Sequence, residues 1–534
     1  MVRILLQQVR RDRLTLPIWI AGTVLLLTVA AQAVVSEYGD AEGRAGILSV
    51  ALATPALLAL RGIPNGDSLG SAVHFQSFAF LAVTIGLMNV FLATRHGRAD
   101  EQSGRRELVQ ATPVSRLAPP LATLVLGLIA NGLFAVLATG GYLSAGLDAG
   151  GAILSAVALA LLGLAFLGVT MIAGELTATS RAANGAGVVL VLGAYALRAA
   201  GDALGRADIP NLTLEPAWPS FVSPIGWGQH TMAFTVDDWA PVGWIAALAA
   251  VSLVVALVVH ARRELGASLL PEGSGRAGAL PGFSSPLALA WRLQWPTLVA
   301  WAGGSALFGL ALGSLVRAIA DANIDNPQIQ QILQSLGHTA ASDVGRVLLI
   351  AVFVIVAGVA AAAGVQAVLR LREEEAEGRL EAVLATPRSR SAWLLSFTLV
   401  GALTVTVVLV ATGAAAAISF AAVDDPDDAW LSIGSAVAAL PAVLSFVGLT
   451  ALFVGLLPRA AIALGWGVYG VLAAIGMFGG LLGLDEEAVK ALSPIANVPA
   501  LPTDDGIPSI VLGAIALAAV ALGAVAFRRR DVAT

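Results

Sequence analysis

Two charged stretches with the same residue order stand far apart in a hydrophobic chain. Residues 104–116 read GRRELVQATPVSR, and residues 378–390 read GRLEAVLATPRSR. With the glutamate that precedes each stretch, both copies fit E-x-x-G-R-x-E-x-x-x-A-T-P-x-S-R. Such a composition favours a helix, in which glutamate and arginine four positions apart form ion pairs. Because the residue before proline disfavours the α region, the pattern predicts two short helices, at 99–111 and 373–385, each ended by the Thr-Pro that follows it.

The residues shared by the two copies are candidates for contact with a soluble protein. Arginines alone would set the orientation of a membrane protein, so the repeated glutamates, glycines and Thr-Pro need another reason. The expected ion pairs are Glu101–Arg105 and Glu375–Arg379, and the alternative is a pair of ordinary arginine-rich loops. The shared residues are Glu101, Gly104, Arg105, Glu107, Thr112, Pro113 and Arg116 in the first copy, and Glu375, Gly378, Arg379, Glu381, Thr386, Pro387 and Arg390 in the second.

The composition places these stretches in an integral membrane protein. The chain has 534 residues, of which 57% are hydrophobic and 12% charged, and its mean hydropathy is +0.85. Soluble domains carry about 25% charged residues. The chain has no cysteine, which excludes disulfides, thiolate metal sites and thiol catalysis. Neither a nucleophile–base arrangement nor a spaced set of metal ligands is recognisable, so we expect no catalytic and no metal site, and no nucleic-acid partner.

Apolar runs of about 20 residues predict an all-α polytopic fold. Each half of the chain holds six runs, which divides it into a first half at 1–261, a cytoplasmic linker at 262–290 and a second half at 291–534. Long outer segments are expected at 37–73, 205–240, 318–344 and 485–506. The twelve predicted spans are 15–36, 74–94, 117–143, 151–177, 184–204, 241–261, 295–317, 345–369, 391–422, 430–457, 460–484 and 507–527.

Charge and internal similarity give the arrangement of the halves. With the N-terminus inside, most of the 30 basic residues fall in cytoplasmic segments, so both termini are predicted to be cytoplasmic in a bacterial plasma membrane. Trp19 matches Trp301, Thr170 matches Thr450, and Ser-Pro-Ile occurs at both 223–225 and 493–495. Two halves of six spans each have the same orientation, so an axis along the membrane normal would relate them.

One alternative family shares the span count. Residues 97–106, GRADEQSGRR, resemble the loop signature of proton-coupled major-facilitator transporters. The second copy departs from that signature, because Leu371 and Leu380 replace its first glycine and second arginine. A proton-coupled drug efflux transporter and a non-transporting membrane scaffold remain the alternative functions.

The order of motifs along the whole chain resembles the permease subunits of ABC exporters, specifically the fused twelve-span permeases of the polyketide-antibiotic (tetronasin-type) family. This resemblance implies a fold like that of type V ABC exporters. It also implies multidrug efflux, and thus antibiotic resistance, by export of drug-like or lipid-like amphiphiles. Besides the paired charged stretches, it rests on Trp291-Arg292-Leu293-Gln294, Ser223-Pro224-Ile225-Gly226-Trp227 and Arg262-Arg263-Glu264-Leu265-Gly266-Ala267.

In such exporters the short cytoplasmic helix after the second span is a coupling helix, which sits in a groove of the ATP-hydrolysing subunit. The resemblance therefore implies coupling helices at 99–113 and 373–387, and Pro113 and Pro387 would set the angle of the next span. The implied contact residues are Glu101, Glu107, Arg116, Glu375, Glu381 and Arg390.

The chain itself lacks an ATP-binding motif. A phosphate loop of the form G-x-x-x-x-G-K-[ST] needs a lysine, and Lys490, the single lysine, has no such glycine pattern around it. No cofactor is expected in this chain, and ATP and Mg²⁺ belong to the partner. Two coupling helices imply two copies of a soluble ABC ATPase.

The resemblance also implies a path for a small amphiphilic substrate between the halves, near the second and fifth spans of each. ATP binding would draw the two ATPases together and rock the halves. Ordinary packing is the alternative role for each residue proposed to line this path. These residues are Phe75, Phe78, Met88, Asn89, Tyr195, Phe353, Trp466 and Tyr469.

Overall fold

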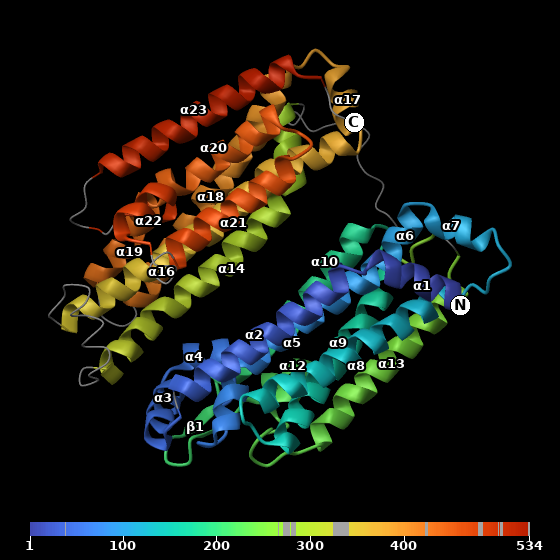
Figure 1. Ribbon diagram of the computed structural model, residues 1–534, viewed down its shortest axis with the longest axis vertical. Helices are drawn as coiled ribbons and strands as arrows, with labels where there is room; N and C mark the ends of the chain where they lie inside the picture. The colour runs from blue at the N-terminus through green and yellow to red at the C-terminus, as the bar shows by residue number, and fades with distance from the viewer. Residues whose placement is uncertain are drawn as a thin grey trace. The chain divides into compact units, whose positions relative to one another are not determined.

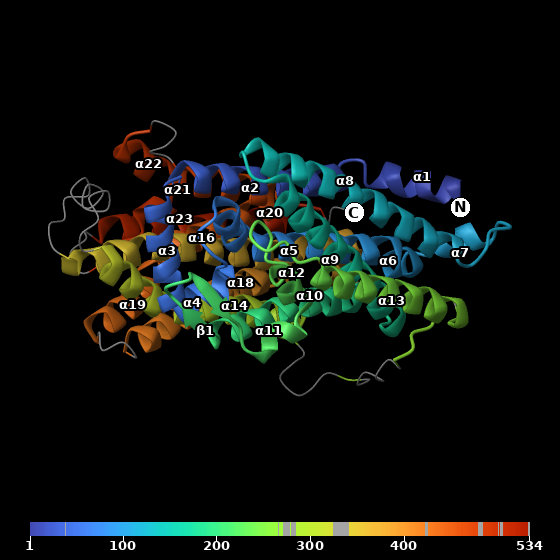
Figure 2. The ribbon, with the colours of Figure 1, turned by 90° about the horizontal axis from the view of Figure 1, so that it is seen from below.

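The protein consists of two helical units. The structure is a computed structural model, and it describes residues 1–37, 39–264, 266–270, 278, 285–323, 341–421, 426–478, 484–499, 501 and 506–531. The units are Met1–Gly275 and Arg276–Thr534, and the boundary falls inside the predicted linker 262–290. Within each unit the long helices run roughly parallel to one another (Figures 1 and 2).

The first unit contains thirteen described helices and one small hairpin, in which β1 (Arg206–Asp208) pairs antiparallel with β2 (Thr213–Glu215). The helices are α1 (Val2–Arg11), α2 (Thr15–Glu37), α3 (Ala41–Ala53), α4 (Pro55–Arg61), α5 (Leu69–His96), α6 (Arg98–Gln102), α7 (Arg105–Gln110), α8 (Ala118–Ser144), α9 (Ala149–Leu176), α10 (Ser180–Ala203), α11 (Trp218–Val222), α12 (Pro224–Gln229) and α13 (Ala240–Arg262).

The second unit repeats the succession of long helices. Its described helices are α14 (Pro286–Asn323), α16 (Ala341–Ala376), α17 (Arg379–Leu384), α18 (Arg390–Ala421), α19 (Pro426–Ala438), α20 (Leu440–Leu456), α21 (Ala461–Phe478), α22 (Glu486–Leu492), a 3₁₀ turn at Ile495–Asn497, and α23 (Ile507–Arg529).

The chain is a multi-pass membrane protein. Among the described residues, ten helical segments are long and apolar enough to cross a membrane. The predicted span 295–317 lies within α14. The predicted span 460–484 begins with α21, and its residues 479–483 lie outside the described residues. Neither helix is among these ten. The predicted span 430–457 is divided at Ala439 into α19 and α20, next to Pro441, whose ring cannot continue the preceding helix without strain.

Small residues bring the helices of each unit close together. In the first unit α9 lies against α5, α8, α10 and α13, and in the second α20 lies against α16, α18, α21 and α23. A Cβ on Gly163 of α9 would lie 2.2 Å from Oδ1 of Asn131, and one on Gly455 of α20 would lie 2.3 Å from the carbonyl oxygen of Gly523. Lipid offers no hydrophobic drive between helices, so such close packing is a main source of their association.

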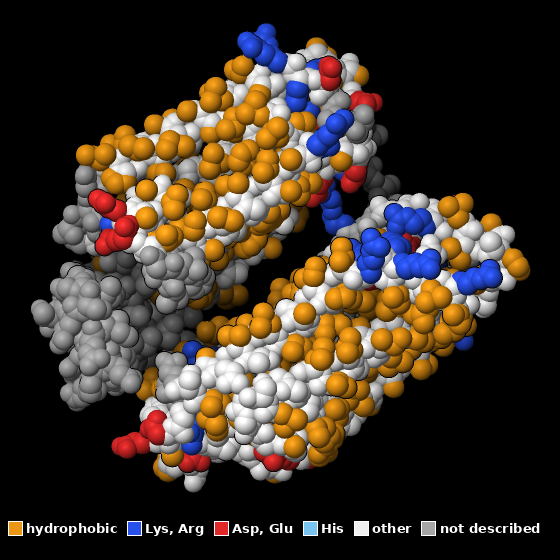
Figure 3. Space-filling model, viewed as in Figure 1, with side chains coloured by type: hydrophobic (Ala, Val, Ile, Leu, Met, Phe, Trp, Pro, Cys, Tyr) orange, Lys and Arg blue, Asp and Glu red, His pale blue; other side chains and the backbone are white. Residues whose placement is uncertain are grey.

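Charged side chains gather at the ends of the units, and apolar side chains cover the faces between (Figure 3). In the first unit arginines crowd the end that holds α1, α6 and α7, and acidic side chains lie toward the end that holds α3 and the hairpin (Figures 1 and 3). Exposed apolar side chains such as Ile129 and Val136 of α8 lie on the faces between, as lipid contact requires.

Candidate functional site at the charged corners

The two repeated stretches form bent corners at the ends of α5 and α16. We define the first corner as residues 97–116 and the second corner as residues 371–390. The prediction of one unbroken helix in each is wrong. Gly104 (φ +71°) separates α6 from α7, and Gly378 (φ +72°) separates α16 from α17. Only glycine adopts this left-handed conformation without steric cost, which explains why both copies carry it.

The Thr-Pro pair ends the short helix of each corner in the same way. α7 ends at Gln110 and α17 at Leu384, before the prolines, as predicted. The hydroxyls of Thr112 and Thr386 donate to the carbonyls three residues earlier, each at 2.6 Å. The corners therefore share a backbone conformation as well as a sequence.

The glycine bend also changes the ion pairs. Arg105 pairs with Asp100 (3.2 Å) and Arg379 with Glu374 (2.5 Å), in both cases five residues earlier. The predicted pairs between residues four apart, Glu101–Arg105 and Glu375–Arg379, are wrong because the left-handed glycine interrupts the helical spacing on which they depend.

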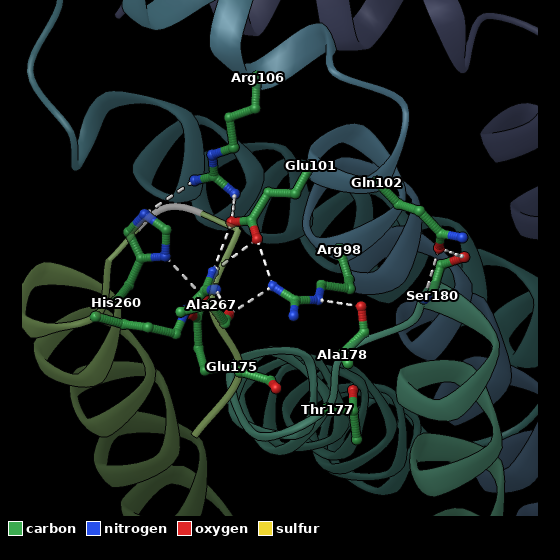
Figure 4. Close-up of polar contacts among 12 residues, drawn as sticks. Arg98, Glu101, Gln102, Arg106, Glu175, Thr177, Ala178, Ser180, His260 and Ala267 are labelled. Carbon is green, nitrogen blue, oxygen red and sulfur yellow. Dashed lines mark hydrogen bonds and ion pairs between the residues drawn. The ribbon is translucent and has the colours of Figure 1, made fainter. Parts of the chain in front are cut away.

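Glu101 is buried at the centre of the first corner (Figure 4). Its side chain is 4% exposed and accepts from Arg98 (2.6 Å), from Arg106 (3.1 Å), and from Arg263 through both oxygens (2.6 and 2.8 Å). Burial alone would lower the pKa of Arg263. The hydrogen bond from Arg263 to Glu101 and the negative charge of Glu175 outweigh burial, so the pKa of Arg263 is raised. Arg263 directly follows α13, so this carboxylate ties the corner to the last long helix of the unit.

Glu375 holds the equivalent place in the second corner. Its side chain is fully buried and accepts from Arg530 through both oxygens, at 2.6 and 2.8 Å, with Arg372 at 3.3 Å. Arg530 directly follows α23, as Arg263 follows α13. Two-pronged arginine–carboxylate contacts fix orientation as well as distance. Each corner is thus held rigidly to the last long helix of its own unit.

A second connection also recurs. Arg98 Nε donates to the carbonyl of Ala178 (3.0 Å), between α9 and α10, and Arg372 Nε donates to that of Pro458 (2.9 Å), between α20 and α21. In the first unit the Ser180 hydroxyl also donates to Gln102 at 2.8 Å (Figure 4). Movement of either corner would therefore reach the fourth, fifth and sixth long helices of its unit.

The corners differ in one set of side chains. In the first unit Arg106 donates to Nε2 of His260 (3.1 Å), whose Nδ1–H donates to Glu175 (2.7 Å), as Figure 4 shows. Burial lowers the pKa of Arg106, while Glu101 and Glu175 oppose that shift. Apolar residues occupy the equivalent positions of the second unit: Leu380, Phe527 and Gly455.

The remaining corner residues face solvent. Glu107, Leu108 and Arg116 are exposed in the first corner, and Leu108 is 74% exposed. In the second corner Glu381 is exposed, while Arg390 donates to the carbonyl of Arg530. The glutamates of the corners thus include buried ones that hold the bend in place, such as Glu101 and Glu375, and exposed ones, Glu107 and Glu381, that form part of its surface. Their contact with a partner stays a prediction.

Most of the residues predicted to line a substrate path pack inside one unit. Tyr195 donates to the carbonyl of Leu60 (2.6 Å) and Tyr469 to that of Gly358 (3.0 Å). Trp466 is 40% exposed. No group of three His, Cys, Asp or Glu that could hold a metal ion occurs in the part of the chain that the structure describes. The path residues that are buried are Phe75, Phe78, Met88, Asn89 and Phe353.

Comparison with known proteins places the chain in a family. A family model for the C-terminal domain of the multidrug efflux system permease Rv1217c matches residues 283–528. The multidrug efflux system permease protein Rv1217c of Mycobacterium tuberculosis (strain ATCC 25618 / H37Rv) is 34% identical over 531 residues, which cover 98% of this chain and 93% of that protein.

Proposed function

Because the chain belongs to the family of the multidrug efflux system permease Rv1217c, we propose that it is the membrane permease of an ATP-driven ABC exporter of the tetronasin type. The observation that carries the proposal is the repeated tie of a buried glutamate to an arginine after the last long helix, Glu101 to Arg263 and Glu375 to Arg530. A loop that only set orientation would need no such tie.

Each corner joins an exposed surface to a rigid support, which is what transmission of force requires. A soluble ATPase would bind the exposed face of each corner, around Glu107 and Glu381. Its movement on binding ATP would then pass through Glu101 and Glu375 to the long helices. Two corners call for two ATPase copies, and the ATP and Mg²⁺ belong to those copies.

The proposal includes the arrangement in the membrane. The twelve long segments would be twelve spans in two parallel repeats, supported by the contacts that recur at equivalent positions. The corners would lie on the cytoplasmic side of a bacterial plasma membrane, with both termini, because arginines gather at that end. The cargo would be a drug-like or lipid-like amphiphile, as the efflux system of the relative suggests.

Reconstitution tests this proposal against proton-coupled transport. The purified chain in vesicles, together with its ATPase, is expected to transport an amphiphilic dye only when ATP is supplied on the corner side, because the corners would receive the movement of the ATPase. An imposed proton gradient is expected to have no effect. Dye movement driven by that gradient, without ATPase or ATP, would instead establish the proton-coupled alternative.

A further inference from the structure

A pocket of about 590 Å³ lies wholly within the first unit, at the end that holds the first corner. It is formed by the start of α2, the last turns of α5 and the start of α10. Pockets of about 300–1,000 Å³ are typical of small-molecule sites. The mechanism proposed above makes no use of it.

One part of the pocket is apolar and aromatic. The rings of Trp19 and Phe91 lie 5.8 Å apart, and Met88 lines the wall beside them. Met88 and Arg95 are seven residues apart on α5, so the pocket extends about 10 Å along that helix. An apolar body of one or two rings would fit against this wall.

Two polar atoms without hydrogen-bond partners belong to residues that line the other, polar part of the pocket. Thr94 and Asn184 line the pocket, and the Thr94 hydroxyl and Oδ1 of Asn184 are buried and have no hydrogen-bond partner among the described residues. Thr94 is only 7% exposed. A buried polar group without a partner costs free energy, so the Thr94 hydroxyl points to a ligand that supplies the missing bond. It can donate to an acceptor, whereas Oδ1 of Asn184 is itself an acceptor and needs a donor.

The charge at this end favours an anion. Arg95 and the ring of His96 bind Asp12, and although burial opposes ionisation, these contacts lower the pKa of Asp12. The positive charge of Arg95 is therefore neutralised by Asp12 and adds no net charge to the pocket. Arg181 also lines the pocket, is exposed, and has no ion-pair partner in the described parts of the chain. It lies at the N-terminus of the 24-residue α10, where the helix dipole adds further positive potential.

We propose that this pocket binds an amphiphile whose anionic head contacts Arg181 and the Thr94 hydroxyl and whose aromatic or branched body lies against Trp19, Phe91 and Met88. The inference rests on the proposed function, which puts this end of the unit at the cytoplasmic leaflet, where such a molecule would collect before export. The same chemistry describes an anionic drug-like compound and an anionic lipid.

The second unit supplies an internal comparison. A pocket of about 470 Å³ lies between α14 and α16, lined by Trp301, which matches Trp19. It lacks the charged end of the first pocket, because Val368 and Leu369 stand at the positions equivalent to Thr94 and Arg95. Arg459, the equivalent of Arg181, does not line it. Within the described parts of the chain, the proposed anion site therefore has no counterpart in the second unit.

The test is a binding titration with two matched probes. The purified chain, in phosphatidylcholine nanodiscs and without ATPase, is titrated with 8-anilinonaphthalene-1-sulfonate and with its uncharged analogue N-phenyl-1-naphthylamine. Arg181→Gln is expected to weaken binding of the sulfonate about tenfold, the usual cost of a lost charged hydrogen bond, and to leave the naphthylamine unaffected. Thr94→Val, which removes the hydroxyl and keeps the size of the side chain, is expected to act in the same direction, and Arg459→Gln is the matched control.

The proposal is overturned if Arg181→Gln leaves sulfonate binding unchanged, or if Arg459→Gln weakens it equally. Adding phosphatidylglycerol to the nanodiscs distinguishes an anionic lipid from an anionic drug-like compound as the ligand. If the lipid displaces the sulfonate from the pocket, the ligand is a lipid. If the sulfonate stays bound, the ligand is an exported compound. Because binding needs no ATPase, a failure of ATP-driven transport would contradict the proposed function and leave this result standing.

Discussion

Replacing Glu101 with alanine is expected to lower the free energy of unfolding by about 3–5 kcal/mol, the range for breaking a buried ion pair. The change removes the one carboxylate that binds Arg98, Arg106 and Arg263 together, and these side chains are only 3–4% exposed. Glu175 still contacts Arg263, but Arg98 and Arg106 would keep buried charges without a carboxylate. Such charges are costly unless paired.

Thermal unfolding of the purified protein measures this effect as a lowered midpoint. Glu107→Ala is the matched control, since Glu107 lies on the same corner but faces solvent, and its loss should leave the midpoint unchanged. Equal midpoints for Glu101→Ala and the wild type would mean that the buried cluster does not hold the corner.

Replacing both Glu375 and Arg530 with glutamine is expected to lower ATP-driven transport at least tenfold, an effect of about 1.4 kcal/mol or more on the coupled step. Glutamine keeps the size of the carboxylate side chain, and changing both partners leaves neither charge of this pair alone. What is lost is the two-pronged contact that links the second corner to α23. ATPase binding should persist, because Glu381 and the exposed face of the corner are untouched.

The measurement is transport by the variant together with the amount of ATPase that co-purifies with it. Glu373→Gln is the control, because Glu373 is 51% exposed and its loss should change neither readout. Full transport by the double variant would show that the Glu375–Arg530 tie carries no movement. Loss of the ATPase itself would show that these residues act at the binding surface.

The sequence predicted the succession of long helices well, because a span of about 20 apolar residues is a local signal. The sequence also located the corners. The same charged pattern occurs twice with Thr-Pro at the same position in each copy, and a shared amino-acid composition would not produce that order. The pairing within the corners was missed for a local reason. The sequence pattern predicts a helix through Gly104 and Gly378, but their left-handed conformation places Arg105 and Arg379 against residues five positions back.

The distant partners of Glu101 and Glu375, Arg263 and Arg530, lie some 160 residues away in sequence, beyond any helical periodicity. A usable signal was present, because an arginine follows the last long helix in both halves, at Arg263 and Arg530. The substrate-path residues could not be assigned in this way. A membrane helix is apolar on all sides, so composition does not tell which face of α5 holds Phe78 against its neighbours and which faces lipid.

The central claim is that the exposed faces of the two corners bind the ATPase. Its most direct test is co-purification of the ATPase with the double variant Glu107→Arg, Glu381→Arg. The control is Arg206→Glu, which reverses a charge on the exposed strand β1, away from the corners. The account predicts that the wild type and the control retain two ATPase copies and the double variant none. If the double variant retains both copies, the corners are not the binding surface.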